Sequence, residues 1–325
     1  MNATVYNLIS ANLNLIKTNK PDFIKWCGLN ELTHWLLPVV DRSGYIKPPY
    51  NFSVCERNKL PNLNDPVINF FDCVDKRIEH IYNLHKHNNK KLVLAYSGGV
   101  DSTTILAGLV KNIPLNILKD ILIVAGSPES IVENSELYSK FILPNFKLAS
   151  AHNIIDSKYN ILLGDPGTGN FRGDYKLKNF NKIQHYVIQK SSKHYGLNLT
   201  SLEEYNWWFF FNYKWQTIDP RWVFRSNPLP KEFWFNEFVV FFNTQYFQSW
   251  SIHEGRHQKS VKDIQKQYIQ DVFKLNHLGN KGKYFSASKL FRGQAIHDAI
   301  TSDYQPVKID DWELYYNPNN SYIGL

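Results

Sequence analysis

The sequence predicts an α/β fold in which a parallel sheet carries helices on both faces. Three short apolar runs, at residues 92–96, 121–125 and 161–163, are each followed at once by a glycine-containing turn. Two of these turns lead into stretches with apolar residues at helical spacing. Strands that alternate with helices are typical of parallel sheets, whose ligands bind at the carboxyl ends of the strands. We therefore expect the three turns to lie along one edge of the sheet.

We expect the chain of 325 residues to divide near residue 88. Residues 1–88 contain short apolar patches between proline- and glycine-bearing turns, and they end in a predicted helix from about residue 67 to 88. The fold of this N-terminal region is not identified by the sequence. Residues 89–325 form the predicted core domain, which becomes helical, aromatic and lysine-rich from about residue 200. The sheet would thus lie between α-rich N-terminal and C-terminal regions.

The aromatic stretch from Tyr205 to Phe235 has two interpretations. It contains pairs and triplets of consecutive aromatic residues with few basic residues between them. Aromatic side chains can stack on nucleic-acid bases, but consecutive aromatics more often pack between helices. We favour the packing role.

The net charge of +8 at pH 7 is concentrated late in the chain. Between Arg256 and Arg292, nine basic residues stand against two acidic ones, so this segment alone carries +7. Such a segment either contacts the phosphates of a nucleotide or nucleic acid or forms an ordinary solvated helix face.

The composition is that of a globular protein, with 43% hydrophobic and 20% charged residues. The longest apolar runs have five residues, far fewer than the ~20 that a membrane-spanning helix needs. The N-terminal segment lacks the pattern of a secretory signal, so we expect a cytoplasmic protein without membrane contact. Cys27, Cys55 and Cys73 fit neither a disulfide framework nor a zinc site.

The strongest functional signal is Ser-Gly-Gly-Val-Asp-Ser, residues 97–102, which follows the first apolar run. Its glycines let backbone N–H groups turn inward, its serine hydroxyls are donors, and the following helix adds the partial positive charge of its N-terminus. These features predict a cradle for phosphate. Asp101 would repel a bare phosphate, so we expect Mg²⁺ between them. The loop lacks the lysine of a Walker A motif, which argues against phosphoryl transfer of the kinase type.

This motif resembles the pyrophosphate loop (PP-loop) of the N-type ATP pyrophosphatases, the adenine nucleotide alpha hydrolase-like superfamily. Its members cleave ATP between the α- and β-phosphates and transfer AMP to a substrate oxygen. The resemblance implies a Rossmann-like fold that binds ATP and Mg²⁺, with Asp101 as the metal ligand. It also implies nucleotide contacts from Ser97, Gly98, Gly99, Val100, Asp101 and Ser102 in the loop, from Val124 in the second strand and from Gly164 after the third.

The third turn narrows the resemblance to one family. Residues 164–171, Gly-Asp-Pro-Gly-Thr-Gly-Asn-Phe, are similar to the Gly-Glu-Gly-x-Asp-Glu-Leu-Phe segment of asparagine synthetases. By that similarity, Asp165 takes the place of the acidic residue that handles protons when ammonia attacks the acyl-adenylate, a role that suits a carboxylate. Asp165 is shorter than the family's Glu, and Thr168 replaces a magnesium-linked aspartate. The alternative is a glycine-rich surface loop.

In the same family a lysine from a late helix contacts pyrophosphate. Lys262 is the nearest counterpart, and Lys266 and Lys283 are the alternatives. An ammonium group there would offset the charge that develops as pyrophosphate leaves. The resemblance to the synthetase domain covers roughly residues 90–290.

The resemblance implies an ATP- and Mg²⁺-dependent amide ligase that activates a small-molecule carboxylate for attack by ammonia or an amine. The residue directly after Met1 is Asn2 and not the cysteine of a glutaminase domain, so glutamine-derived nitrogen would come from a separate glutaminase. No cysteine follows Cys73, which argues against sulfur transfer and against a zinc-bearing deazaguanine synthase. Two alternatives remain open. One is a tRNA- or nucleobase-modifying enzyme of the same superfamily, and the other is a non-catalytic nucleotide-binding relative, which Thr168 would suit.

Overall fold

The computed structural model describes residues 4–7, 41–46, 59–126, 130, 133–150, 158–164, 180, 182–214, 238–258, 260–275, 305–309 and 312–317. Its contacts group the chain into two compact units, each assembled from separate segments. One unit comprises residues 66–168 and 229–290, and the other comprises residues 1–65, 169–228 and 291–325. We describe each unit by itself.

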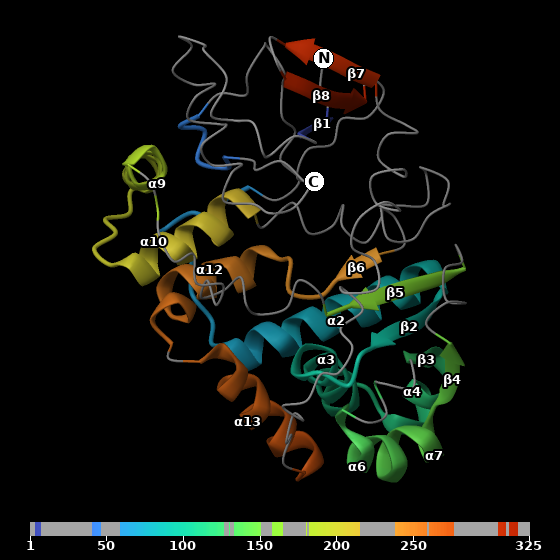
Figure 1. The fold of residues 1–325 in the computed structure, drawn as a ribbon. Helices are drawn as coiled ribbons and strands as arrows, with labels where there is room; N and C mark the ends of the chain where they lie inside the picture. The colour runs from blue at the N-terminus through green and yellow to red at the C-terminus, as the bar shows by residue number, and fades with distance from the viewer. Residues whose placement is uncertain are drawn as a thin grey trace. The chain divides into compact units, whose positions relative to one another are not determined.

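The first unit contains a five-stranded sheet in which every neighbouring pair of strands is parallel (Figure 1). Its strands are β2 (Lys91–Tyr96), β3 (Leu122–Gly126), β4 (Lys147–Ser150), β5 (Tyr159–Leu163) and β6 (Phe238–Val240). The order across the sheet is β4-β3-β2-β5-β6. The predicted α/β class and parallel sheet are therefore confirmed, and the three apolar runs of the sequence form β2, β3 and β5.

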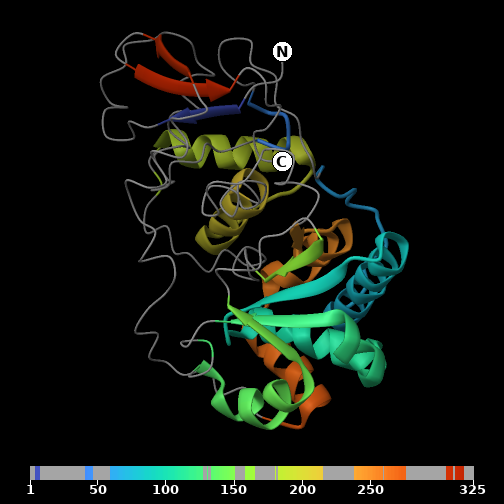
Figure 2. The same ribbon diagram turned by 90° about the vertical axis from the view of Figure 1, so that its right-hand side faces the viewer.

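The strand order reverses in the middle of this sheet. From β2 the chain proceeds to β3 and β4 on one side, and then returns to β5 and β6 on the other side of β2. Counted in chain order, the arrangement is 3-2-1-4-5, that of a doubly wound sheet. Figure 2 shows the strands turned successively against one another, as the usual twist of sheets requires. The reversal places the ends of β2 and β5 side by side.

The helices of this unit, with the 3-10 turn η8 and the π-helical turn η3, connect and cover the strands. They are α2 (Phe70–Asn88), α3 (Val100–Asn112), α4 (Leu115–Ile121), α6 (Ser135–Leu137), η3 (Tyr138–Ile142), α7 (Leu143–Asn145), α12 (Gln245–His253), η8 (Gly255–His257) and α13 (Val261–Phe273). Leu92, Val93 and Leu94 are all buried although they alternate along β2, so both faces of this strand are covered. Among the described helices, none is both long and apolar enough to cross a membrane.

Helix α3 packs against α2 on one side and α13 on another. A Cβ atom at Gly108 of α3 would lie only 2.9 Å from side-chain carbons of Val74 and Ile78 in α2. The absence of a side chain at Gly108 therefore permits the close approach of the two helices.

Asn69 is the N-cap residue of α2, and its side chain accepts a hydrogen bond of 2.9 Å from the backbone N–H of Asp72. This helix, which the sequence analysis placed before the core domain, belongs to the same unit as the sheet.

The second unit contains helices and a small antiparallel sheet. Its elements are β1 (Thr4–Asn7), α9 (Lys182–Tyr195), α10 (Leu202–Trp208), the π-helical turn η5 (Phe209–Lys214), β7 (Gln305–Ile309) and β8 (Trp312–Asn317). The sheet has the order β1-β8-β7 and so combines strands from both ends of the sequence. We expected α-rich terminal regions, but the first and last elements that the structure describes are strands. The partner of β1 is β8, which is distant in sequence, whereas β8 also pairs with the nearby β7.

The aromatic residues of α10 and η5 form the core of this unit. Trp207, Trp208, Phe209, Phe211 and Tyr213 are completely buried. The hydroxyl of Ser191 in α9 accepts hydrogen bonds from Trp208 Nε1 at 2.9 Å and from Tyr213 Oη at 2.5 Å. These contacts confirm the packing role for this part of the aromatic stretch, while residues 215–237 lie outside the described residues.

Candidate functional site

The loop between β2 and α3 is held in a shape that requires glycine at residue 98. Gly98 has φ +76°, in the left-handed region that other residues rarely adopt. A Cβ atom there would lie 2.4 Å from the carbonyl oxygen of Ser130 and 2.9 Å from Cβ of Glu133. Both of these residues follow β3. The loop after β2 is therefore packed directly against the segment after β3.

Hydrogen bonds between its two serines close this loop. The hydroxyl of Ser102 accepts from the backbone N–H of Ser97 and can donate to the carbonyl of Gly99, both at 3.2 Å. The Ser97 hydroxyl lies 3.2 Å from that of Ser102 and accepts from the N–H of Gly99 at 3.3 Å. Ser102 is only 2% exposed, whereas Ser97 is exposed. Ser102 thus shapes the loop from within, and Ser97 lies on its accessible side.

Helix α3 starts within this loop. Gly99 is its N-cap residue and has no side chain that could accept from the first N–H groups of the helix. Glycine, a helix N-terminus and a hydroxyl are together the usual elements of an anion-binding loop. Residues 97–102 therefore join the end of β2 to the N-terminus of α3, with a left-handed turn at Gly98.

The turn after β5 meets the loop after β2. A Cβ atom at Gly164 would lie 3.1 Å from the backbone nitrogen of Ser102 and 3.4 Å from Cβ of Asp101. This contact occurs where the strand order reverses, the position at which doubly wound sheets bind their ligands. Gly164 and residues 97–102 thus lie together, as expected. Asp165 and Thr168 lie outside the described residues.

The carboxylate of Asp101 is held by a residue that the sequence analysis did not select. Gln265 Nε2 in α13 donates to Asp101 Oδ1 at 2.9 Å and to Thr104 Oγ1 at 3.3 Å. Gln265 is completely buried, and Asp101 is partly buried. The only sequence signal for Gln265 is its place one helical turn after Lys262, since nothing local distinguishes it from the other glutamines of α13.

Two of the three candidate lysines lie on α13, and both are exposed. Lys262 precedes Gln265 by three residues, so the two side chains lie on the same side of the helix. Lys266 is 3.7 Å from the exposed carboxylate of Asp263. Lys283, the third candidate, lies outside the described residues. Lys262 thus lies one helical turn before Gln265, the residue through which α13 contacts the loop.

Val124 lies deeper in the fold than the loops do. It is buried in the middle of β3, where it pairs with Leu94 of β2 and Leu148 of β4. Gly126 ends the strand, and a Cβ atom there would lie 2.6 Å from the hydroxyl of the buried Ser130. The end of β3, rather than its middle, therefore borders the loops.

Tyr96 lies at the end of β2, immediately before the loop. Burial raises its pKa to about 12, and the nearby negative charge of Glu133 acts in the same direction. Tyr96 therefore remains neutral throughout the physiological range and adds no charge of its own to the site.

The part of the site that the structure describes offers few protein ligands to a metal. Among the residues that the structure describes, no group of three or more His, Cys, Asp or Glu side chains could hold a metal ion. A single carboxylate beside a phosphate loop suits Mg²⁺, which keeps several waters and takes further ligands from substrate phosphates. Asp101 fits a magnesium ion that arrives with a nucleotide.

Comparisons with protein-family models, with curated proteins and with solved structures found no match. A function for this chain is therefore inferred from its own motif and from the loops that meet at the sheet edge.

Proposed function

We propose that this chain is a cytoplasmic ATP- and Mg²⁺-dependent ligase of the N-type ATP pyrophosphatase superfamily. It would transfer AMP from ATP to a small-molecule carboxylate, release pyrophosphate, and form an amide with ammonia or an amine, as asparagine synthetases do. The observation that carries this proposal is the contact of Gly164 with residues 97–102 at the reversal of the strand order.

The sheet supports the proposal because its reversal point is a general site for nucleotides. The phosphates of a nucleotide bind there on a glycine-rich loop that follows the first strand and opens a helix. Here that loop is Ser-Gly-Gly-Val-Asp-Ser, and it follows β2, the strand from which the sheet is built outward on both sides. The adenine nucleotide alpha hydrolase-like fold is the arrangement that the motif and the strand order together favour.

The residues of the site would divide the work as follows. Backbone N–H groups of Gly98 and Gly99 and the hydroxyl of Ser97 would bind the phosphates, and Asp101 would hold magnesium. Magnesium, when bound, would neutralise part of the phosphate charge. Lys262 would offset the charge on departing pyrophosphate. Asp165 would accept a proton from the attacking amine. Catalysis would consist mainly of positioning the carboxylate against the α-phosphate.

The described part of the aromatic stretch gives no support to the tRNA-modifying alternative. The aromatic side chains from Tyr205 to Tyr213 are buried in the core of their unit, so they do not offer faces for base stacking. The basic residues of α13 are still available to a polyanion. The test below therefore includes tRNA as a substrate pool.

The direct test is product analysis with ATP labelled in its α-phosphate. The protein is incubated with Mg²⁺ and labelled ATP, together with pools of carboxylate substrates plus ammonia or, separately, with bulk tRNA. The Asp101→Asn variant removes the proposed metal ligand, and Asp120→Asn, an exposed residue of α4, is the matched control. We expect AMP and pyrophosphate from one pool only, and no turnover in Asp101→Asn.

Other products would change the assignment. ADP as the labelled product would overturn adenylation altogether. Turnover with tRNA alone would favour the base-modifying alternative. Binding of ATP without any product in every pool would favour the non-catalytic relative.

A further inference from the structure

We infer that Gln265 is a positioning residue, whose side-chain amide orients the carboxylate of Asp101 for magnesium. This inference rests on the proposed function in one respect only, namely that Asp101 binds Mg²⁺ when a nucleotide is bound. It adds to that function a residue from α13, which lies far from the loop in sequence.

Gln265 contacts the loop and helix α3 through two hydrogen bonds from one nitrogen. Its Nε2 donates to Asp101 Oδ1 at 2.9 Å and to Thr104 Oγ1 at 3.3 Å. The Thr104 hydroxyl in turn donates to the carbonyl oxygen of Val100 at 2.8 Å. The amide therefore contacts both the acidic side chain of the loop and the first turn of α3.

These bonds restrict the one side chain whose orientation matters for a metal. The carboxylate of an aspartate rotates easily about its terminal torsion. An N–H donor at 2.9 Å fixes one of its oxygens and thereby the plane of the group. Mutation of residues that hold metal ligands in this way typically lowers metal affinity by about 10- to 100-fold.

The chemical type of Gln265 suits this role better than a charged residue would. A lysine or arginine at this buried position would neutralise the carboxylate and compete with the metal for it. A glutamate would repel Asp101 or share a proton with it. A neutral amide orients the carboxylate and leaves its negative charge available to a cation.

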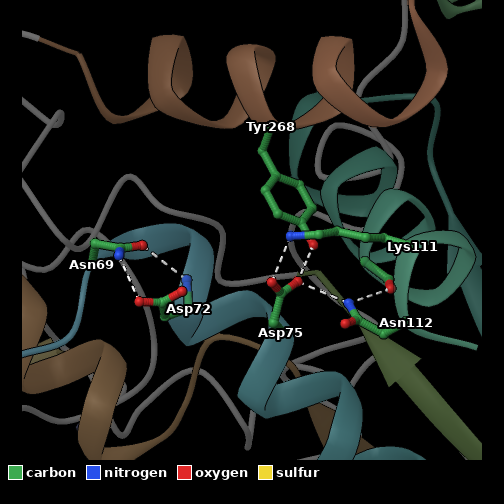
Figure 3. A network of polar contacts seen from close by, with 7 residues as sticks. Asn69, Asp72, Asp75, Lys111, Asn112 and Tyr268 are labelled. Carbon is green, nitrogen blue, oxygen red and sulfur yellow. Dashed lines mark hydrogen bonds and ion pairs between the residues drawn. The ribbon is translucent and has the colours of Figure 1, made fainter.

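A second set of contacts attaches α13 to the same helices without touching the loop. Figure 3 shows Tyr268 of α13 extending toward Asp75 of α2, where Lys111 and Asn112 of α3 also converge. Tyr268 Oη donates to Asp75 Oδ1 at 2.5 Å. Tyr268 lies three residues after Gln265 and is equally buried. It is therefore a matched position for separating loss of packing from loss of positioning.

The experiment compares Gln265→Met with Tyr268→Phe. Methionine keeps the length and bulk of glutamine but has no N–H donor. Binding of ATP is measured by titration calorimetry without Mg²⁺ and at increasing Mg²⁺ concentrations, and thermal unfolding is measured for each protein. The affinity for ATP should rise with Mg²⁺ concentration in both Gln265→Met and the unmodified protein. We expect Gln265→Met to reach half of this rise at a Mg²⁺ concentration about 10-fold higher than the unmodified protein does. Its affinity for ATP without metal should be unchanged. Tyr268→Phe should lower the unfolding temperature and leave the Mg²⁺ requirement as it is.

Three results would overturn the inference. These are an unchanged Mg²⁺ requirement in Gln265→Met, an equal shift in both variants, and ATP binding by the unmodified protein that does not depend on Mg²⁺. Failure of the proposed function alone is distinguishable, because the unmodified protein would then bind Mg²⁺ and ATP without releasing pyrophosphate. The comparison of the two variants would still decide the role of Gln265. A fourth result, the absence of any ATP binding, would overturn both proposals.

Discussion

The hydroxyl of Tyr268 and the carboxylate of Asp75 join α13 to α2 through a hydrogen bond of 2.5 Å. Asp75 also accepts from Lys111 Nζ at 2.6 Å and from Asn112 Nδ2 at 2.8 Å, both at the end of α3. One carboxylate thus joins three helices of the unit that carries the sheet (Figure 3).

Tyr268→Phe removes only the hydroxyl group, and with it the hydrogen bond from Tyr268 to Asp75. The bond involves a charged acceptor and is partly buried, so we expect a loss of about 1–2 kcal/mol in the free energy of unfolding. Urea unfolding at pH 7 measures this loss. A variant as stable as the unmodified protein would show that Lys111 and Asn112 satisfy Asp75 without the tyrosine.

Asp75→Asn should have an effect that depends on pH. Burial alone would raise the pKa of Asp75, but hydrogen bonds from Lys111, Tyr268 and Asn112 outweigh it and lower the pKa below the ordinary value. A carboxyl with a lowered pKa in the folded state stabilises the protein above its unfolded pKa of about 4, and the contribution is lost as pH falls through the folded pKa.

The difference in unfolding free energy between Asp75→Asn and the unmodified protein should therefore be largest near pH 7 and shrink below about pH 4. Chemical unfolding at a series of pH values measures it. Glu79→Gln, an exposed position on the same helix, is the control. A difference that stays constant with pH would contradict the assignment of the stabilisation to the ionised carboxylate.

Gly98→Ala should be more damaging than Gly44→Ala, although the two glycines have similar backbone conformations. Their φ angles are +76° and +71°. A Cβ atom at Gly44 meets no atom within 4 Å, whereas one at Gly98 would lie 2.4 Å from the carbonyl oxygen of Ser130. Gly44→Ala should cost about 1–2 kcal/mol, from backbone conformation alone.

Gly98→Ala should cost more than that and should also reduce ATP binding, because the loop must move away from Ser130. Thermal unfolding and calorimetric ATP titration of both variants measure the two effects. Equal stability losses together with intact ATP binding in Gly98→Ala would show that the site lies elsewhere.

Lys262→Met and Lys266→Met test which cation of α13 acts on pyrophosphate. Lys262 lies one helical turn before Gln265, whereas Lys266 forms an exposed ion pair of 3.7 Å with Asp263. If Lys262 offsets the charge on the leaving group, its loss should lower kcat at least about 10-fold. Loss of Lys266 should change kcat by less than about twofold, since exposed ion pairs contribute little. The reverse ranking would reassign the role to Lys266.

The central part of the fold could be predicted because local pattern and tertiary environment agree there. Strands β2, β3 and β5 are continuous apolar runs that end in glycine-bearing turns, the pattern of strands buried on both faces. Edge strand β4 has the unremarkable sequence Lys-Leu-Ala-Ser and was not predicted. Strand β1 depends on hydrogen bonds from β8, which no local pattern can indicate.

The candidate site also contains residues that a local sequence pattern indicates and residues that depend on tertiary packing. The loop of residues 97–102 and Gly164 could be proposed from sequence because glycines follow apolar runs there, and the left-handed φ of +76° at Gly98 requires one. Gln265 could not, because its importance comes only from the packing of α13 on α3. Nor could the sequence indicate that Ser102 lies inside the loop and Ser97 on its accessible side, since the two serines differ only in their tertiary surroundings.

The pairing of β1 with β8 has a consequence for synthesis on the ribosome. Thr4 pairs with Asn317, so Thr4–Asn7 has no partner in this sheet until residues 314–317 have been added. The segments that build the parallel sheet end at residue 290 and emerge earlier. Because domains generally fold as units during synthesis, the sheet with the loop of residues 97–102 can be complete while Thr4–Asn7 still lacks its neighbour.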